Sequence, residues 1–159
     1  MQIIVMAVGK AKEKYWREAL AEYAKRLSAY VRLDVVEVED EAVPENASVA
    51  DHQRILRVEA DRLRRHLRDR DAIIALDRAG HAYDSEAWSR EYDRLCGASY
   101  GRLVFIIGGS LGLDGTLLAD AAVRWSFGPL TLPHQLARVV LLEQLYRGIR
   151  ISRGEPYHK

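Results

Sequence analysis

The sequence predicts an α/β fold, with a mainly parallel sheet and helices on both of its faces. Five short apolar runs have the length and composition of buried strands, and stretches with helical spacing of apolar residues separate most of them. Strands that alternate with helices are joined by crossovers, which produces parallel strands covered on both sides. With 48% hydrophobic and 30% charged residues, the 159-residue chain is expected to form one domain with a proper core.

The first elements follow from their apolar spacing. Residues 2–8 (QIIVMAV) are an apolar run that ends at Gly9, which predicts a buried strand. In residues 12–30 the apolar positions fall on one face of a helix. Residues 31–38 alternate Val or Leu with charge and predict a second strand, whereas residues 39–50 are acidic and without period, so we expect a loop.

The middle of the chain continues the alternation. Residues 49–67 have helical spacing, and residues 72–76 (AIIAL) predict a third strand that ends at the polar turn DRAGHAYD. Asp84 or Ser85 can then cap a helix that runs to about Leu95.

The last third predicts two more strands and two more helices. Residues 103–107 and 123–127 are the strands, and a short helix over residues 116–122 separates them. Pro133 suits the first turn of the last helix, where its missing N–H costs nothing. That helix is expected to reach about Ile151 and to leave the polar tail SRGEPYHK.

Several classes of protein are excluded by composition. Apolar runs such as Val139 to Leu142 are far shorter than the roughly 20 residues that cross a bilayer. The opening MQIIVMAVGK lacks the pattern of a signal peptide. A single cysteine, Cys96, excludes an internal disulfide, and the histidines and acids show no metal-ligand spacing. We therefore expect a cytoplasmic protein without a metal.

Charge is unevenly distributed although the formal net charge is only +1. Residues 34–51 hold seven acids and no Lys or Arg, whereas residues 54–70 hold seven arginines against three acids. The arginine-rich segment is either a solvated helix face or a surface for RNA, because the planar guanidinium suits phosphate and base recognition. The sequence leaves both alternatives open.

Residues 104–115 (VFIIGGSLGLDG) are the first candidate site, because an apolar strand ends there in a glycine-rich turn. Glycine permits positive φ or the close approach of another group. The pattern is GGxxG at the fourth strand, unlike the GxGxxG of dinucleotide sites, and no Lys-Ser/Thr pair follows as in a P-loop. The turn is either a tight connection or a site for a nucleoside without phosphates.

Two further candidate sites follow. Residues 127–138 (FGPLTLPHQLAR) offer few functional side chains, so their chemistry would come from backbone groups that can read an adenine edge; the alternative is a simple loop. The tail carries Arg153, Tyr157 and His158, which together make a plausible catalytic or substrate-binding set unless the terminus is merely disordered. His134 is a rival base at the start of the last helix.

These three sites together resemble a known family. The ordered motifs IIGGSLGL, LTLPHQLARVVLLEQLYR and RGEPYHK, with the opening MQIIVMAVGKAKEKYWREALAEYAKRL and the segment IIALDRAGHAYDSEAW, are similar to the ribosomal RNA large-subunit methyltransferase H family. That family is a member of the SPOUT class of S-adenosylmethionine-dependent methyltransferases. The resemblance covers the whole chain; Gly148, where the family more often has Ala, and His81, where Lys is common, depart from it.

The resemblance implies a single SPOUT methyltransferase domain over residues 1–159, with a C-terminal trefoil knot and a substrate-binding tail at residues 152–159. It implies a cytoplasmic homodimer that methylates N3 of a pseudouridine in 23S ribosomal RNA. We expect the substrate to be this RNA within the assembled ribosome. The tail residues Arg153, Tyr157 and His158 would be catalytic. S-adenosylmethionine would bind the knot loops, at Leu76, Gly108, Phe127, Gly128, Pro129, Leu130, Thr131 and Leu132.

Two rival functions remain at this point. One is a non-catalytic RNA-binding or ribosome-associated module that uses the arginine-rich segment. The other is a different nucleotide-binding α/β enzyme, against which the lack of a phosphate-binding signature in the glycine turn argues.

Overall fold

The computed structural model describes residues 1–159, and its centre is a five-stranded sheet of order β2-β1-β4-β3-β5. All four strand pairings are parallel. The prediction of a mainly parallel sheet is therefore confirmed. The strands are β1 (Gln2–Val8), β2 (Arg32–Val38), β3 (Asp71–Ala82), β4 (Arg102–Ile107) and β5 (Val123–Ser126).

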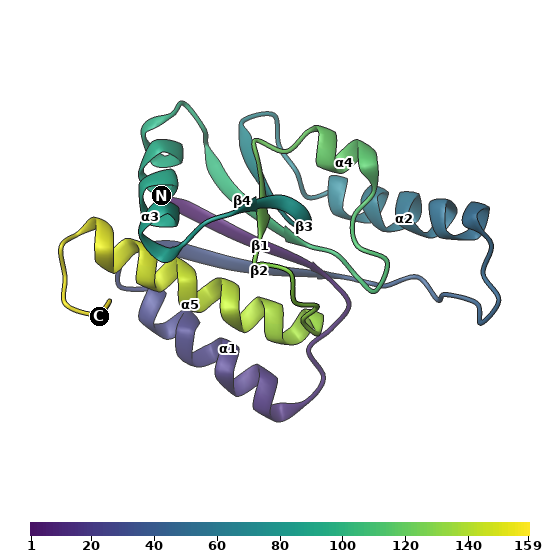
Figure 1. Ribbon diagram of the computed structural model, residues 1–159, viewed down its shortest axis with the longest axis horizontal. Coiled ribbons are helices and arrows are strands. Elements are labelled where there is room, and N and C mark those ends of the chain that lie inside the picture. Colours follow the sequence, from purple (N-terminus) through teal and green to yellow (C-terminus); the bar gives the residue numbers. More distant parts are fainter.

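Helices cover both faces of this sheet, as the alternation predicted (Figure 1). Alternate residues of β1 show the division: Ile3 and Val5 belong to the larger core, whereas Ile4 and Met6 belong to the smaller one. The larger core contains residues of α1 (Lys14–Leu27), α3 (Ser85–Gly97) and α5 (His134–Ser152). The smaller core contains residues of α2 (Val49–Arg64) and α4 (Gly115–Ala119). No helix combines the length and apolar composition that crossing a membrane requires.

Local capping explains where the helices begin. Ser48 accepts a hydrogen bond from the N–H of Asp51, whose carboxylate accepts the N–H of Ser48 in return, which starts α2. Asp84 caps α3 by accepting the N–H of Ala87 at 2.7 Å, one of the two caps that the sequence offered. Pro133 lies immediately before α5 rather than in its first turn.

The third strand is longer than the sequence predicted. We expected it to end at Leu76 before a polar turn, but β3 continues to Ala82. Its pairing with β5 shifts between Leu76 and His81, so the intervening residues form a bulge. Polar residues are accommodated there because the bulged segment lies largely at the surface.

Close packing between α3 and α5 explains why residue 148 is a glycine. A Cβ at this position of α5 would lie 3.0 Å from Cδ1 of Trp88, which stacks on Trp125 with ring centroids 3.8 Å apart. The hydroxyl of Ser89 also donates to the carbonyl of Gly148 at 2.7 Å. The absent side chain therefore lets α3 and α5 approach closely, which offsets the roughly 0.5–1 kcal/mol that glycine costs inside a helix.

A buried arginine fixes α5 to the sheet. Arg138 is 1% exposed and donates to Glu37 Oε2 and to the carbonyl of Gly9, both at 2.6 Å. Burial alone would raise the pKa of Glu37, but its hydrogen bonds from Arg138 and from the N–H of Ala11 outweigh that effect and lower it. The start of α5 is thereby held against the ends of β1 and β2.

Candidate functional site

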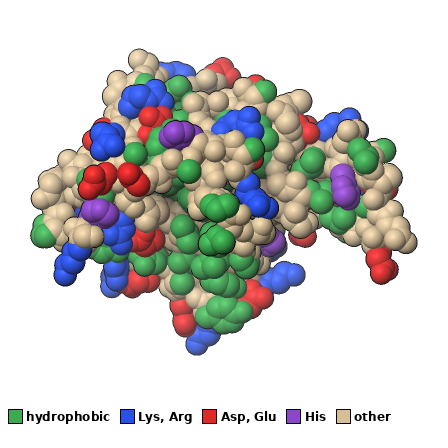
Figure 2. Space-filling view, viewed as in Figure 1, with side chains coloured by type: hydrophobic (Ala, Val, Ile, Leu, Met, Phe, Trp, Pro, Cys, Tyr) green, Lys and Arg blue, Asp and Glu red, His purple; other side chains and the backbone are tan.

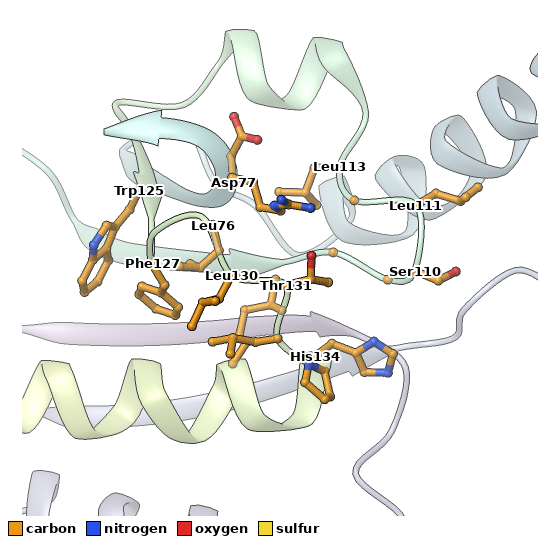
Figure 3. Close-up of a pocket in the computed structure, with 18 of the residues that line it drawn as sticks. Leu76, Asp77, Ser110, Leu111, Leu113, Trp125, Phe127, Leu130, Thr131 and His134 are labelled. Atoms are coloured by element: carbon orange, nitrogen blue, oxygen red, sulfur yellow. The ribbon is translucent and has the colours of Figure 1, made fainter. Parts of the chain in front are cut away.

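A pocket of about 450 Å³ lies at the carboxyl ends of three neighbouring strands. Its walls come from the segments that follow β3, β4 and β5, and from the first turn of α5. Figure 3 shows Leu76, Phe127 and Leu130 grouped on one side, with Ser110 and Leu111 on the opposite side. Crevices at the carboxyl ends of parallel strands are the usual ligand sites of α/β sheets.

The glycine turn forms one wall because its backbone folds very tightly. The N–H of Gly112 donates to the carbonyl of Gly109 at 3.1 Å, and Gly112 has φ +82°. A Cβ at Gly108 would overlap the carbonyl oxygen of Gly112. Gly108 is therefore required by close approach within the turn, whereas Gly112 is required by its positive φ.

The loop after β5 forms the other wall and presents free backbone groups. Gly128 has φ +105°, and its N–H donates to the hydroxyl of Ser126 at 3.1 Å. The backbone N–H and C=O groups of Leu130, Thr131 and Leu132 have no hydrogen-bond partner within the chain. Free donors and acceptors beside apolar walls suit a flat heterocycle such as adenine, whose edge both donates and accepts.

Few charged side chains line this pocket, and both Asp77 and Arg78 are bound to neighbouring groups. Asp77 accepts a hydrogen bond from Arg124 Nε at 2.8 Å, and Arg78 Nη2 donates to the carbonyl of Pro129 at 3.1 Å. His134 lines the mouth at the start of α5. Arg78 is the only lysine or arginine that lines the pocket, so the pocket lacks the cluster of cations that a polyphosphate needs. These residues fit an adenosyl group without phosphates.

The structure gathers most of the predicted cofactor residues in this one pocket. Pro129 is the exception: it is exposed, and it contributes its carbonyl to Arg78 instead of lining the cavity. Sequence reasoning missed Asp77 and Arg78, although both directly follow the apolar run AIIAL. The predicted residues that do line the pocket are Leu76, Gly108, Phe127, Gly128, Leu130, Thr131 and Leu132.

A buried carboxyl group lies behind the glycine turn. Glu59 of α2 is 5% exposed, and its carboxyl oxygens are 3.5 Å from where a Cβ of Gly109 would lie. Glu59 also accepts the N–H of Glu41 at 2.9 Å, which ties the acidic loop to α2. Burial raises the pKa of Glu59, against the effect of this hydrogen bond. The turn is thus supported from behind by a group that favours its neutral form.

The tail forms a separate cluster on α5. The hydroxyl of Tyr157 donates to Glu143 Oε1 at 3.2 Å, and the guanidinium of Arg147 lies 4.6 Å from the centroid of the Tyr157 ring. Arg147 Nη1 is 3.3 Å from His158 Nδ1 and pairs with Glu143. Burial, and then the charge of Glu143, raises the pKa of Tyr157. We call Glu143, Arg147, Tyr157 and His158 the tail cluster.

The third predicted catalytic residue lies apart from this cluster. Arg153 places its guanidinium 4.9 Å from the ring centroid of Tyr30. The hydroxyl of Tyr30 donates to Glu155 at 2.6 Å, and Arg150 Nη1 donates to Tyr30 at 3.1 Å. The tail is therefore held by two sets of contacts, and Arg153 belongs to the set that anchors its beginning. Sequence reasoning also missed Glu143 and Arg147, whose i,i+4 spacing was a visible signal.

The pocket and the tail cluster do not meet within one chain. Glu143 follows His134 by nine residues, which is two and a half helical turns, or about 14 Å along the axis. Half-integral turns place the two side chains on opposite sides of α5. The side chains gathered around Glu143 therefore face away from the pocket that His134 lines.

An apolar surface lies beside the tail cluster. Figure 2 shows hydrophobic side chains gathered over α1 and the N-terminal half of α5. Tyr15 is 61% exposed, and Trp16, Leu136, Val139 and Val140 are only half-buried. A helix that is apolar on its outer side as well as its inner side normally has a second surface packed against it. Contiguous patches of this kind mark interaction sites.

Comparison with known proteins gives concordant results. Residues 1–158 match the family model described as "Predicted SPOUT methyltransferase". The chain is 46% identical over 159 residues to "Ribosomal RNA large subunit methyltransferase H" of Streptococcus suis (strain 05ZYH33), covering 100% of both chains. The protein of that name from Pelotomaculum thermopropionicum is 49% identical over 156 residues, 98% of each chain.

A solved structure shares the fold. A probable methylase family protein from Haemophilus influenzae Rd KW20 superposes with a TM-score of 0.53 at 9% identity, over 96% of this chain and 66% of that one. At this identity the likeness concerns the fold alone.

Proposed function

The chain belongs to the SPOUT methyltransferase family, and we propose that it transfers a methyl group from S-adenosylmethionine to N3 of a pseudouridine in 23S ribosomal RNA. One observation carries this proposal: identity of 46% over the full length to a protein named for methylation of the large-subunit RNA. The rival, a non-catalytic RNA-binding module, has no use for an adenosine-sized pocket with free backbone groups.

The pocket residues suit this cofactor, which supplies an electrophilic methyl group on a sulfonium. Leu130, Thr131 and Leu132 offer backbone groups to the adenine edge, while Leu76 and Phe127 provide apolar contact. The glycine turn from Gly108 to Gly112 lines the pocket on its other side, where the rest of the cofactor would lie. In an in-line displacement, the contribution of these residues is to hold the methyl carbon close to the nucleophile and aligned with it.

The tail cluster supplies side chains that a pseudouridine needs. The N3–H proton must leave before or during attack, so that the N3 electron pair can form the bond to carbon while the carbon–sulfur bond breaks. His158 is the proposed base that takes this proton, and Arg147 offers a cation for the developing N3 anion. Tyr157 can stack on the base or hydrogen-bond it.

A homodimer would bring the pocket of one protomer close to the tail cluster of the other. The apolar surface on α1 and α5 adjoins the tail cluster, so a second copy packed there can offer its pocket to this tail. Each active site would then use the pocket of one protomer and the tail of its partner. This arrangement is isologous, as expected for a two-fold dimer. The trefoil knot that the resemblance implies stays a prediction.

We place this reaction in the cytoplasm, because its substrate is ribosomal RNA. The formal net charge of +1 gives weak long-range attraction to a polyanion. A composite surface of RNA and protein compensates for this, which favours the assembled ribosome as substrate.

Two measurements test the proposal. Calorimetry should detect S-adenosylmethionine binding and no ATP binding, because the pocket lacks a polyphosphate cradle. Mass spectrometry of ribosomal RNA should then find one added methyl group at N3 of a pseudouridine after incubation with enzyme and cofactor. Binding of ATP instead, or a ribosome left unmethylated by an enzyme that binds the cofactor, would reject the proposed activity.

A further inference from the structure

Some arginines of the arginine-rich segment, residues 54–70, form ion pairs or hydrogen bonds within the protein, and others form neither. Arg62 pairs with Glu41 at 2.7 Å and Arg64 with Asp120 at 2.8 Å, while Arg70 donates to the carbonyl of Ser99 at 2.8 Å. The other four guanidinium groups have neither an ion pair nor a hydrogen bond, and all four are exposed: Arg54, Arg57, Arg65 and Arg68.

The four free arginines lie along one side of α2 and just beyond its end. Arg54, Arg57 and Arg65 follow one another at spacings that keep them on one helix face, over about 16 Å. Asp61 is the only acid within this row, and it forms no ion pair. The fourth, Arg68, lies just beyond the C-terminal end of α2, where it and Arg65 border a cavity of about 340 Å³.

That cavity combines cations with an apolar floor. Ile4, Met6, Val36 and Leu67 line it together with Arg65 and Arg68. Its other polar groups are His66, Asp34 and Arg102. Asp34 pairs with Arg32 at 3.5 Å, and Arg102 pairs with Asp71 at 2.6 Å. The ion-paired groups leave Arg65 and Arg68 as the free charges at its rim.

We infer that this row of arginines and the cavity at its end form a second binding site for the substrate RNA, in which Arg65 and Arg68 bind backbone phosphates. The inference rests on the proposed function. Guanidinium groups bind phosphate oxygens through two parallel hydrogen bonds, and the apolar floor leaves room for the attached nucleoside. The volume is sufficient for one nucleotide, at the lower end of ligand sites.

The position of this site suits one RNA that also enters the active site. Arg102 at the start of β4 lines the cavity, whereas Ile107 at the end of β4 lines the proposed cofactor pocket, roughly 17 Å along the strand. The cavity lies on the α2 side of the sheet, opposite α1 and α5 (Figure 1). It therefore stays open in a dimer that packs through α1 and α5.

The test compares two variants that each lose two exposed, unpaired cations. Arg65→Gln/Arg68→Gln removes the proposed phosphate contacts, and Lys25→Gln/Arg90→Gln removes the same charge from α1 and α3 on the other side of the sheet. Binding to a protein-free fragment of 23S RNA and to ribosomes is measured over a range of salt concentrations, with methylation kinetics and S-adenosylmethionine affinity alongside.

We expect the Arg65→Gln/Arg68→Gln variant to bind both RNA substrates roughly tenfold more weakly than the wild type. The slope of log binding constant against log salt concentration should be smaller in magnitude by roughly 1.4 to 1.8. KM for the ribosome should rise while kcat and cofactor affinity stay unchanged, and the control should match the wild type. Equal slopes for all three proteins overturn the inference. Weaker binding to ribosomes alone also overturns it, in favour of a ribosomal-protein contact. Wild-type protein that binds RNA without methylating it contradicts the proposed function and leaves the RNA site standing.

Discussion

The two ends of the proposed active site are built from different chemical groups. Around the start of α5, the pocket offers free backbone groups and apolar walls, and its charged side chains are tied to neighbours. Halfway along α5, the tail cluster offers a carboxylate, a guanidinium, a phenol and an imidazole within contact of one another. Shape and backbone suffice to hold an adenosyl group, whereas moving a proton requires titratable side chains.

This contrast has a structural consequence. The two regions face away from each other on one helix, so under the proposed mechanism the pocket and the tail of one chain do not form an active site together. The division predicts that variants of the pocket and variants of the tail lose different functions.

The largest effect is expected at the glycine turn. Gly108→Val places side-chain atoms against the carbonyl of Gly112 and displaces the pocket wall. A displacement of about 1 Å in such a site costs on the order of 100-fold in methylation rate. Because the displaced wall is part of the proposed cofactor pocket, calorimetry should also detect no S-adenosylmethionine binding. Gly115→Ala is the matched control, since nothing lies within 4 Å of a Cβ there. A folded Gly108→Val protein with wild-type cofactor affinity would contradict this account of the pocket.

The tail should serve the RNA and not the cofactor. Deletion of residues 155–159 removes Tyr157 and His158 and is expected to slow methylation by roughly 100- to 10,000-fold, the range of general acid–base contributions. Cofactor affinity should stay within a few-fold of wild type, because no tail residue lines the pocket. Loss of cofactor binding with RNA affinity retained would reverse the roles assigned to the two regions.

A smaller, pH-dependent effect distinguishes the base from the rest of the tail. His158→Ala activity should rise with pH, because N3 of the pseudouridine then loses its proton unaided. Tyr157→Phe keeps the imidazole and serves as the comparison, with no such recovery expected. Methylation rates of both variants between neutral and alkaline pH give the answer, and a flat profile for His158→Ala would remove His158 from the role of base.

The pocket could be predicted from the sequence to a greater extent than the tail cluster. The strand positions and the pocket loops could be predicted, because apolar runs ending in Gly108 or Gly128 are local signals. The continuation of β3 to Ala82 could not, because it depends on pairing with β5 across a bulge. Nor could the tail be placed: Tyr157 meets Glu143 fourteen residues earlier through a chain reversal that no local pattern encodes.

The smallest effect concerns the carboxyl group behind the glycine turn. Because burial raises the pKa of Glu59 above its ordinary value of 4.5, the folded protein favours the protonated form. The wild type should therefore lose stability, relative to Glu59→Gln, as pH rises above about 4.5, and the difference between the two should stop changing at lower pH. Glu37→Gln should show the opposite sign, since the pKa of Glu37 is lowered. The wild type should lose stability relative to Glu37→Gln as pH falls below about 4.5. Thermal unfolding from about pH 2.5 to 8 covers both windows, and parallel curves would contradict the assignment.

The central claim, that each active site joins the pocket of one protomer to the tail of its partner, is tested by mixing two inactive variants. Gly108→Val lacks a pocket and His158→Ala lacks the base, so a heterodimer of the two has one site in which both parts are intact. With random assortment, an equimolar mixture should recover about one quarter of wild-type methylation. A mixture that forms heterodimers and stays inactive, or a wild-type protein that is fully active as a monomer in sedimentation, would contradict the shared site.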